Sequence, residues 1–222
     1  MSIKITTLAN GMRIVSDPMT TVESATLGVW VDVGTRHETP EMNGISHLLE
    51  HMAFKGTKKR SALDISREIE AVGGHINAYT SRESTAYYVK ILKDDVALGI
   101  DLIADILQNS IFDPNELDRE RNVILQEILQ TNDTPDEVIF DNFQQTAYPN
   151  QPIGRQILGN SKIVKSLKRD KLMRYMASNY NNSTMVLAAA GKVNHDELVS
   201  QTEYAFRNLR KGNKPNNKAA NY

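Results

Sequence analysis

The 222-residue sequence contains no cysteine. This absence excludes a disulfide framework, a cysteine nucleophile and cysteine-ligated zinc, so any metal would have to be held by histidine, aspartate or glutamate. The sequence also lacks an excess of either charge, because 26 lysines and arginines stand against 27 aspartates and glutamates. With no basic tract, a strongly basic protein that binds nucleic acid is excluded.

Long hydrophobic runs are absent as well. No stretch approaches the ~18 consecutive apolar residues of a membrane-spanning helix, so we expect no membrane partner. The first eight residues lead directly into alternating, strand-like sequence and lack the pattern of a secretory or organellar leader. Together these absences favour a cytoplasmic protein. A hydrophobic content of 40% still supplies enough apolar material for a core.

The hydrophobic periodicity predicts an α+β fold. Strands are expected at 12–16, 25–33, 75–80, 85–92 and 184–190, and helices at 44–54, 61–72, 96–107, 114–130, 136–147, 167–178 and 195–208. This order predicts a mixed, mostly antiparallel sheet covered by helices on one face. Residues 1–210 would form one domain, and 211–222, rich in asparagine, a linker-like tail.

The segment 44–54 contains the pattern His-x-x-Glu-His, formed by His47, Glu50 and His51. On a helix with about 100° per residue, these three side chains fall within an arc of about 100°. The leucine, isoleucine and methionine side chains of the segment fall on the opposite side. The helix would therefore bury an apolar face and present two imidazoles and a carboxylate together.

Two histidines four residues apart on a helix can bind one metal ion through nitrogens about 2.0–2.1 Å from it. Zinc lowers the pKa of bound water towards ~7, and Glu50 could accept the proton as general base. The alternative is that these side chains only solvate an exposed helix face. The pattern is rare by chance in a chain with five histidines, and it has the residue order of the inverted zinc peptidases, which favours a metal site.

A catalytic zinc site has a third protein ligand and an open position. The remaining histidines, His37, His75 and His195, are expected to have surface, capping or hydrogen-bonding roles.

The better candidates for the third ligand are two carboxylates on the helix expected at 114–130. Glu120 and Glu127 are two turns apart and fall on its apolar side with Val123 and Ile124. A buried carboxylate needs a cation, which could be a metal ion or a lysine or arginine. Either glutamate could be the ligand, with the other supporting the site.

The segments 44–56, 77–83 and 120–127 resemble the pitrilysin-type (M16) zinc peptidases. The similarity extends to about residue 208 and is greatest to the branch with the mitochondrial processing peptidase β subunit and its bacterial homologues. The resemblance implies a LuxS/MPP-like metalloprotease half with His47, His51 and Glu127 as zinc ligands. Glu50 would be the general base, and Glu120 would support the site.

The resemblance also implies substrate contacts. Asn77, Ala78 and Tyr79 match the sheet edge on which family members bind an extended peptide as an added strand, which is consistent with β-augmentation. Glu137 and Asp141 match acids that recognise an arginine near the scissile bond, although a solvated helix face is an equal alternative.

Phe54 resembles a residue lining the pocket for the side chain after the cleavage point. A core aromatic would explain it equally well.

Family members generally pair such a half with a second, similarly folded half, and this sequence stops where that half would begin. The expected function is a zinc metalloendopeptidase that cleaves extended or presequence-like peptides with a second half, a separate subunit or another copy of the chain as partner. The alternatives are a non-catalytic structural homologue, or a metal-binding half that is inactive alone.

Overall fold

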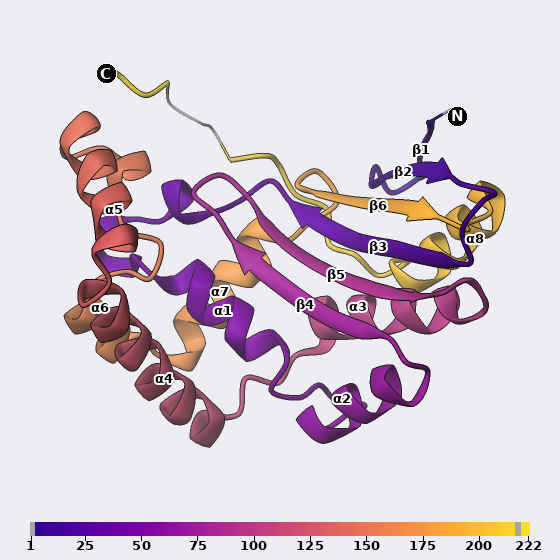
Figure 1. The fold of residues 1–222 in the computed structure, drawn as a ribbon, viewed down its shortest axis with the longest axis horizontal. Coiled ribbons are helices and arrows are strands. Elements are labelled where there is room, and N and C mark those ends of the chain that lie inside the picture. Colours follow the sequence, from indigo (N-terminus) through magenta and orange to yellow (C-terminus); the bar gives the residue numbers. More distant parts are fainter. Residues whose placement is uncertain (1–2, 216–218) are drawn as a thin grey trace.

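A six-stranded mixed sheet forms one side of the molecule (Figure 1). The computed structural model describes residues 3–215 and 219–222. The strands are β1 (Lys4–Thr7), β2 (Arg13–Pro18), β3 (Ser24–Val31), β4 (His75–Thr80), β5 (Thr85–Leu92) and β6 (Met185–Gly191). Their order is β1-β2-β6-β3-β5-β4, in which only β2 and β6 are parallel. The predicted mixed, mostly antiparallel sheet is confirmed.

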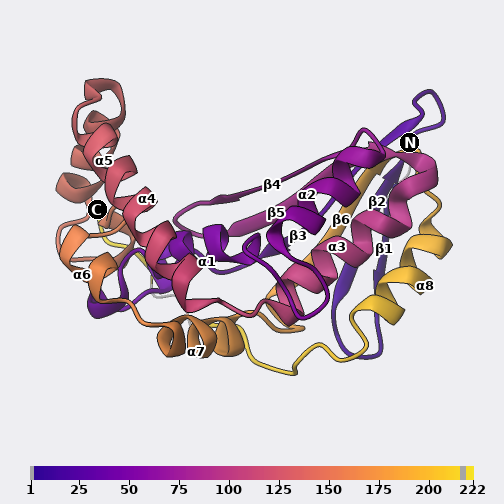
Figure 2. The ribbon, with the colours of Figure 1, turned by 90° about the horizontal axis from the view of Figure 1, so that it is seen from below.

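The helices form two groups. Their bounds are α1 (Ile45–Ala53), α2 (Ala62–Ala71), α3 (Val96–Asn109), α4 (Pro114–Asn132), α5 (Pro135–Ala147), α6 (Ser161–Ser166), α7 (Arg169–Asn179) and α8 (His195–Ala205). Helices α2, α3 and α8 pack on one face of the sheet, whereas α1 and α4–α7 gather beside it (Figures 1 and 2). Among the described residues, no helix is both long and apolar enough to cross a membrane.

Three elements differ from the sequence-based expectation. Strand β1 was not among the expected strands, although its sequence is strand-like. Helix α6 was not expected, because six residues with only Val164 buried carry too little periodicity to detect. Helix α8 ends at Ala205 and not at residue 208, since Phe206 leaves the helix to become fully buried. The remaining expected strands and helices are present, with ends that move by up to about three residues.

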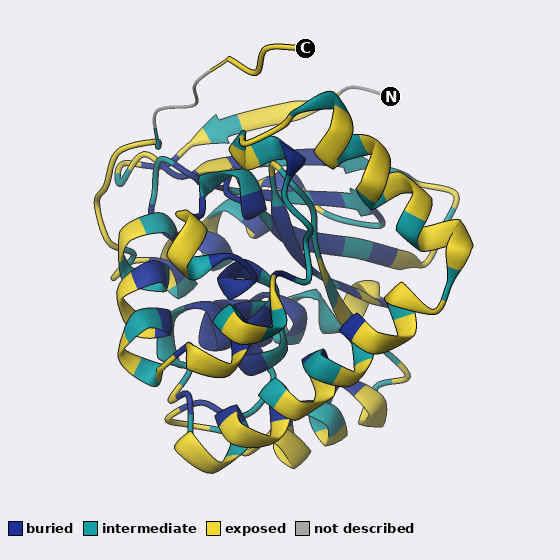
Figure 3. Ribbon diagram, turned by 90° about the vertical axis from the view of Figure 1, so that its left-hand side faces the viewer, coloured by how far each residue is buried: buried dark blue, intermediate teal, exposed yellow. Residues whose placement is uncertain are grey.

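The core continues from the sheet to α1. The buried side chains of this helix include Leu48, Leu49 and Met52, which are inaccessible to solvent. The surrounding helices expose their outer faces, so buried residues concentrate at the centre (Figure 3). Burial of one face of α1 leaves its opposite face to carry polar side chains.

A buried carboxylate holds the N-terminus of α1. Glu38 is 3% exposed and accepts hydrogen bonds from the backbone N–H groups of Gly44 and Ser46, both at 2.8 Å, and from Asn43 Nδ2 at 3.0 Å. Burial raises the pKa of Glu38, against the lowering effect of these hydrogen bonds. The first-turn N–H groups of a helix have no partner within the helix, so this carboxylate fixes the position at which α1 begins.

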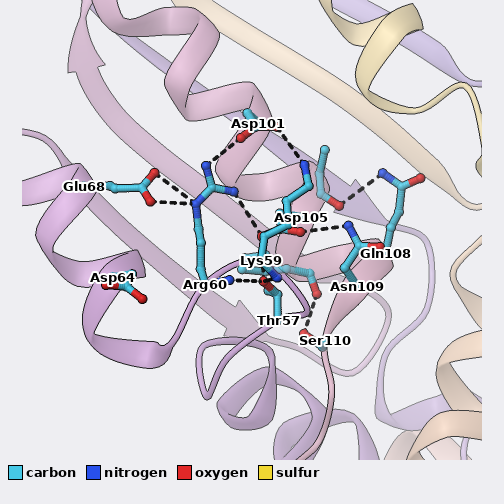
Figure 4. Close-up of polar contacts among 12 residues, drawn as sticks. Thr57, Lys59, Arg60, Asp64, Glu68, Asp101, Asp105, Gln108, Asn109 and Ser110 are labelled. Carbon is cyan, nitrogen blue, oxygen red and sulfur yellow. Dashed lines mark hydrogen bonds and ion pairs between the residues drawn. The ribbon is translucent and has the colours of Figure 1, made fainter.

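An ion-pair cluster holds the loop that follows α1 (Figure 4). Arg60 binds Glu68 of α2 and, on α3, Asp101 and Asp105, the last through Nη1 at 3.0 Å from Oδ2. The Asp105 side chain is fully buried and also accepts a hydrogen bond from Thr57 Oγ1 at 2.7 Å. The loop is therefore attached to the helix layer under the sheet.

Replacing Arg60 by methionine tests the importance of this attachment. Arg60→Met would leave Asp105 buried without its cation, and we expect a loss of about 3 kcal/mol in the free energy of unfolding. Chemical denaturation measures this loss. Lys58→Met, in the same loop and exposed, is the matched control, for which a change below about 0.5 kcal/mol is expected. Equal stability of the two variants would contradict the proposed importance of the cluster.

Candidate metal centre

The polar face of α1 carries the side chains expected there. His47, Glu50 and His51 are partly exposed, in contrast to the buried leucines and methionine on the other side of the helix. The ring centroids of His47 and His51 lie 4.6 Å apart. The arrangement derived from helical spacing is confirmed, and both imidazoles face α4, which packs against α1.

Glu127 of α4 meets the two histidines. Its Oε2 atom lies 3.9 Å from His47 Nε2 and 3.7 Å from His51 Nε2. One potential ligand atom from each of the three residues lies within 4.8 Å of the others. Ligands about 2.1 Å from a tetrahedral zinc ion are about 3.4 Å apart, so a small contraction would let these atoms coordinate one ion.

The environment of Glu127 also fits a cation. Its Oε2 atom is buried and has no hydrogen-bond partner among the described residues, although both imidazole nitrogens lie beside it. A buried carboxylate oxygen without a donor is costly unless a cation completes it. Two histidines and a carboxylate are a ligand set typical of catalytic zinc, with the fourth position left open.

His47 is held in the form that binds metals. Burial and, to a smaller extent, the neighbouring charge of His51 lower the pKa of His47 to about 3. The imidazole is therefore neutral at physiological pH, and a neutral imidazole nitrogen is what a metal ion requires.

Glu120 of α4 contacts the Nδ1 side of the His51 ring. It is 6% exposed, and its Oε2 atom lies 2.9 Å from His51 Nδ1 while its Oε1 atom lies 2.7 Å from Lys55 Nζ. Burial would raise the pKa of Glu120, but the hydrogen bonds of Lys55 and His51 bring it below its usual value. The sequence left a metal ion, a lysine or an arginine as the possible partner of a buried carboxylate, and the partner of Glu120 is a lysine. Of the two glutamates, Glu127 is the one that faces the Nε2 atoms.

Glu50 lies beside the three potential ligands without being one of them. Thr80 Oγ1 at the end of β4 donates a hydrogen bond to Glu50 Oε2 at 2.5 Å. Burial raises the pKa of Glu50, with Glu127 adding to the rise, while the hydrogen bond from Thr80 and the charge of His51 oppose it. A raised pKa makes a carboxylate a better proton acceptor near neutral pH.

The expectation for α4 was partly wrong. Val123 was placed on the same apolar side as the two glutamates, but it is 43% exposed, whereas Ile124 is fully buried. Glu127 is likewise less buried than Glu120. The face of α4 turned to the core is narrower than its sequence suggests, because its buried residues are limited to Leu117, Glu120, Ile124 and Ile128.

Two of the other histidines, His195 and His37, make hydrogen bonds away from α1. His195 is buried between two hydroxyls, with Nε2 2.8 Å from Thr6 Oγ1 and Nδ1 2.8 Å from Ser16 Oγ. His37 Nδ1 accepts a hydrogen bond from the Gly34 N–H at 3.0 Å. The metal-ligand group found within the described residues does not include them.

The predicted substrate strand is the edge of the sheet. Asn77, Ala78 and Tyr79 lie in β4, whose outer side pairs with no other described strand and runs beside α1 (Figure 1). The Ala78 N–H donates to Asn77 Oδ1 at 2.8 Å, and Tyr79 Oη accepts from Trp30 Nε1 at 3.2 Å. An extended segment along this edge would lie next to the metal-ligand group.

Two predicted acids lie on α5. Asp141 binds Arg82, from the turn between β4 and β5, with Oδ1 2.8 Å from Nη2. Glu137 is exposed and accepts a hydrogen bond from Thr131 Oγ1 at 3.0 Å. The two carboxylates thus have different partners, and the partner of Asp141 is a guanidinium.

Phe54 follows the last residue of α1. It is partly buried and packs against the core, with its ring centroid 6.3 Å from that of Tyr87. Its expected role in binding substrate stays a prediction.

Three residues with contacts at the site were not found from the sequence: Lys55, Thr80 and Glu38. Their contacts cross between elements, and no local pattern indicates such pairings. Lys55 is four residues after His51, so its helical spacing was the one available signal.

Comparisons with known proteins agree with this geometry. Residues 13–161 match the family model described as insulinase (peptidase family M16), and residues 166–222 match the model described as peptidase M16 inactive domain. A probable mitochondrial-processing peptidase subunit β of Arabidopsis thaliana is 47% identical over 93% of this chain and 39% of its own length. An uncharacterized zinc protease of Streptomyces coelicolor is 44% identical over 92% of this chain and 45% of its own length.

Solved structures show the same fold. A protease from Helicobacter pylori aligns with a TM-score of 0.89 and 25% identity over all of this chain and 53% of its own. A peptidase M16 inactive domain from Pseudomonas fluorescens aligns with a TM-score of 0.90 at 16% identity, over 98% of this chain and 53% of its own. The chain spans about two fifths of the length of the curated relatives described above. The fold, the ligand group and the matched family model together establish that this chain belongs to peptidase family M16.

Proposed function

We propose that this chain is the metal-binding half of a zinc-dependent metalloendopeptidase. The observation that carries the proposal is the convergence of His47 Nε2 and His51 Nε2 on the Oε2 atom of Glu127, with Glu50 alongside. This Oε2 atom has no hydrogen-bond partner among the described residues. Zinc is the expected ion because the set contains two imidazoles and one carboxylate.

A division of chemical roles follows from the surroundings of each residue. His47, His51 and Glu127 would hold the ion, which when bound would act as a Lewis acid on the peptide carbonyl and on water. Glu50 accepts a proton from the attacking water and passes it to the leaving amide nitrogen as the peptide bond breaks. Thr80 keeps the Glu50 carboxylate turned towards β4, where the peptide would lie.

The substrate would be an extended peptide added to the edge of β4. Backbone hydrogen bonds to Asn77–Tyr79 would hold it, and an arginine of the peptide would bind the acids of α5. Asp141 binds the guanidinium of Arg82 in this structure, and an arginine of the peptide would take the place of Arg82 there. Carboxylates and guanidinium groups form directional, charge-assisted hydrogen bonds.

Cleavage would require a second homologous half or subunit. Each of the two curated relatives described above is more than twice as long as its matched part, and β4, beside the site, is an edge strand of the described sheet. A closing wall excludes water and strengthens the electrostatic interactions inside an active site. The complete enzyme would thus combine this half with another, and a cytoplasmic location is proposed for it.

Metal binding by this chain tests the ligand assignment. We expect one zinc ion per chain, and Glu127→Gln should weaken zinc binding more than about 100-fold, because an amide cannot replace the negative ligand. Competition titration with a chromophoric chelator measures the affinity. Glu116→Gln on the same helix is the control and should leave it unchanged. Absence of stoichiometric zinc in the unmutated protein would contradict the proposal.

Replacement of Glu50 separates binding from chemistry. Glu50→Gln should retain zinc but reduce peptide cleavage by the complete two-half enzyme by about 10³-fold or more, since the amide cannot accept the proton. Zinc content and kcat are measured on the same preparation. Normal turnover by a fully zinc-loaded Glu50→Gln enzyme would show that Glu50 is not the base, and loss of zinc would assign it a different role.

Peptide selectivity tests the acids of α5. In the complete enzyme, Asp141→Asn should lower kcat/KM for an arginine-containing peptide by about 10- to 100-fold, the usual value of a charge-assisted hydrogen bond. The same peptide with citrulline in place of arginine should be cleaved equally by both enzymes. Asp136→Asn, on the same helix, provides the control. An equal effect on both peptides would argue that Asp141 has only a structural role.

A further inference from the structure

We propose that Lys55 is a positioning residue for the metal site, acting through Glu120 on His51. This inference rests on the proposed metal-binding function. Its basis is a continuous set of three contacts: Lys55 Nζ lies 2.7 Å from Glu120 Oε1, Glu120 Oε2 lies 2.9 Å from His51 Nδ1, and His51 Nε2 faces Glu127.

The first step concerns the orientation of the Glu120 carboxylate. Each of its oxygens has a different partner, and the side chain is only 8% exposed. A carboxylate in such surroundings requires compensation by donors or cations. With Oε1 held by Lys55, the group cannot rotate freely, and Oε2 stays directed at His51. Without the ammonium, one oxygen of a buried anion would lose its partner, and rotation towards solvent would compete with the contact to His51.

The second step concerns the proton on His51. A carboxylate at Nδ1 keeps the proton on that nitrogen and leaves the lone pair of Nε2 for the metal. His51 Nε2 lies 3.7 Å from Glu127 Oε2, on the side where the ion would be held. Whatever fixes Glu120 therefore also fixes the tautomer and the ring orientation of His51. Carboxylate–histidine–zinc arrangements typically lose 10- to 100-fold in metal affinity when the outer partner is removed.

The third step is that Lys55 is itself well placed. Its backbone N–H donates to Met52 O at 3.2 Å, which ties Lys55 to the end of α1, and the following Gly56 O accepts from Ile111 N. Thr57, two residues on, is hydrogen-bonded to the buried Asp105 of α3 (Figure 4). The loop thus holds Lys55 between α1 and the start of α4, so the ammonium reaches Glu120 from a fixed backbone.

The test uses the protein of this sequence, with zinc as the one added ligand. Lys55→Met should weaken zinc binding by about tenfold, and Lys55→Arg should recover most of it, because a guanidinium can still bind Glu120. Lys58→Met, three residues away and exposed, is the matched control and should bind zinc like the unmutated protein. Circular dichroism checks folding, and Lys55→Gln, which keeps a hydrogen-bond donor, replaces Lys55→Met if that variant does not fold.

A second readout needs no metal. The ¹⁵N chemical shifts of the His51 imidazole in the zinc-free protein report the tautomer, and we expect Nδ1–H to dominate in the unmutated protein and a mixture of tautomers in Lys55→Met. Unchanged shifts together with zinc affinity within about twofold of the unmutated protein would overturn the proposal, as would tighter zinc binding. If the unmutated protein bound no zinc, the proposed function would fail, while the tautomer measurement would still decide the role of Lys55.

Discussion

Burial of one face of α1 is the constraint on which the site depends. With its leucines and methionine in the core, the helix can turn His47, Glu50 and His51 only towards α4 and β4. Glu38 fixes the start of the helix, and the Arg60 cluster fixes the loop after its end. Because a metal site tolerates errors of only a fraction of an ångström, support at both ends of this short helix is part of the function.

Three glutamates at one site differ through their surroundings. Glu127 has a buried oxygen that accepts no hydrogen bond from the described residues and lies near two imidazole nitrogens. Glu120 is buried with both oxygens paired. Burial raises the pKa of Glu50, whose carboxylate accepts a hydrogen bond from the hydroxyl of Thr80. The same functional group can thus serve as ligand, support and base, since hydrogen bonds and burial set which form of each carboxylate is stable.

Local features of the site could be predicted from the sequence, and long-range ones could not. Helical spacing was enough to orient His47 and His51, because all atoms involved lie within two turns. Spacing alone could not decide between Glu120 and Glu127, which are on the same side of α4. The family resemblance implied Glu127 as the ligand, and in the structure its Oε2 atom lies 3.9 and 3.7 Å from the two Nε2 atoms. The partnerships of Lys55 with Glu120 and of Thr80 with Glu50 span 65 and 30 residues, and no periodic pattern encodes them.

Long-range pairings in the sheet could not be predicted from the sequence either. Strands β4 and β5 were predictable as a hairpin, but the insertion of β6, over 150 residues after β3, between β2 and β3 was not. With β6 placed there and β3 paired with β5, β4 is left as an edge of the described sheet. Such pairings depend on packing of the complete chain. The edge then places Asn77–Tyr79 beside α1, so the proposed peptide-binding surface adjoins the potential metal ligands.

The most direct test of the metal site is anomalous diffraction at the zinc absorption edge from crystals of the zinc-loaded protein. The geometry predicts a single strong peak about 2.0–2.2 Å from His47 Nε2, His51 Nε2 and a carboxylate oxygen of Glu127. A stoichiometric zinc ion bound by other residues, or no peak among these three in protein that contains zinc, would contradict the assignment.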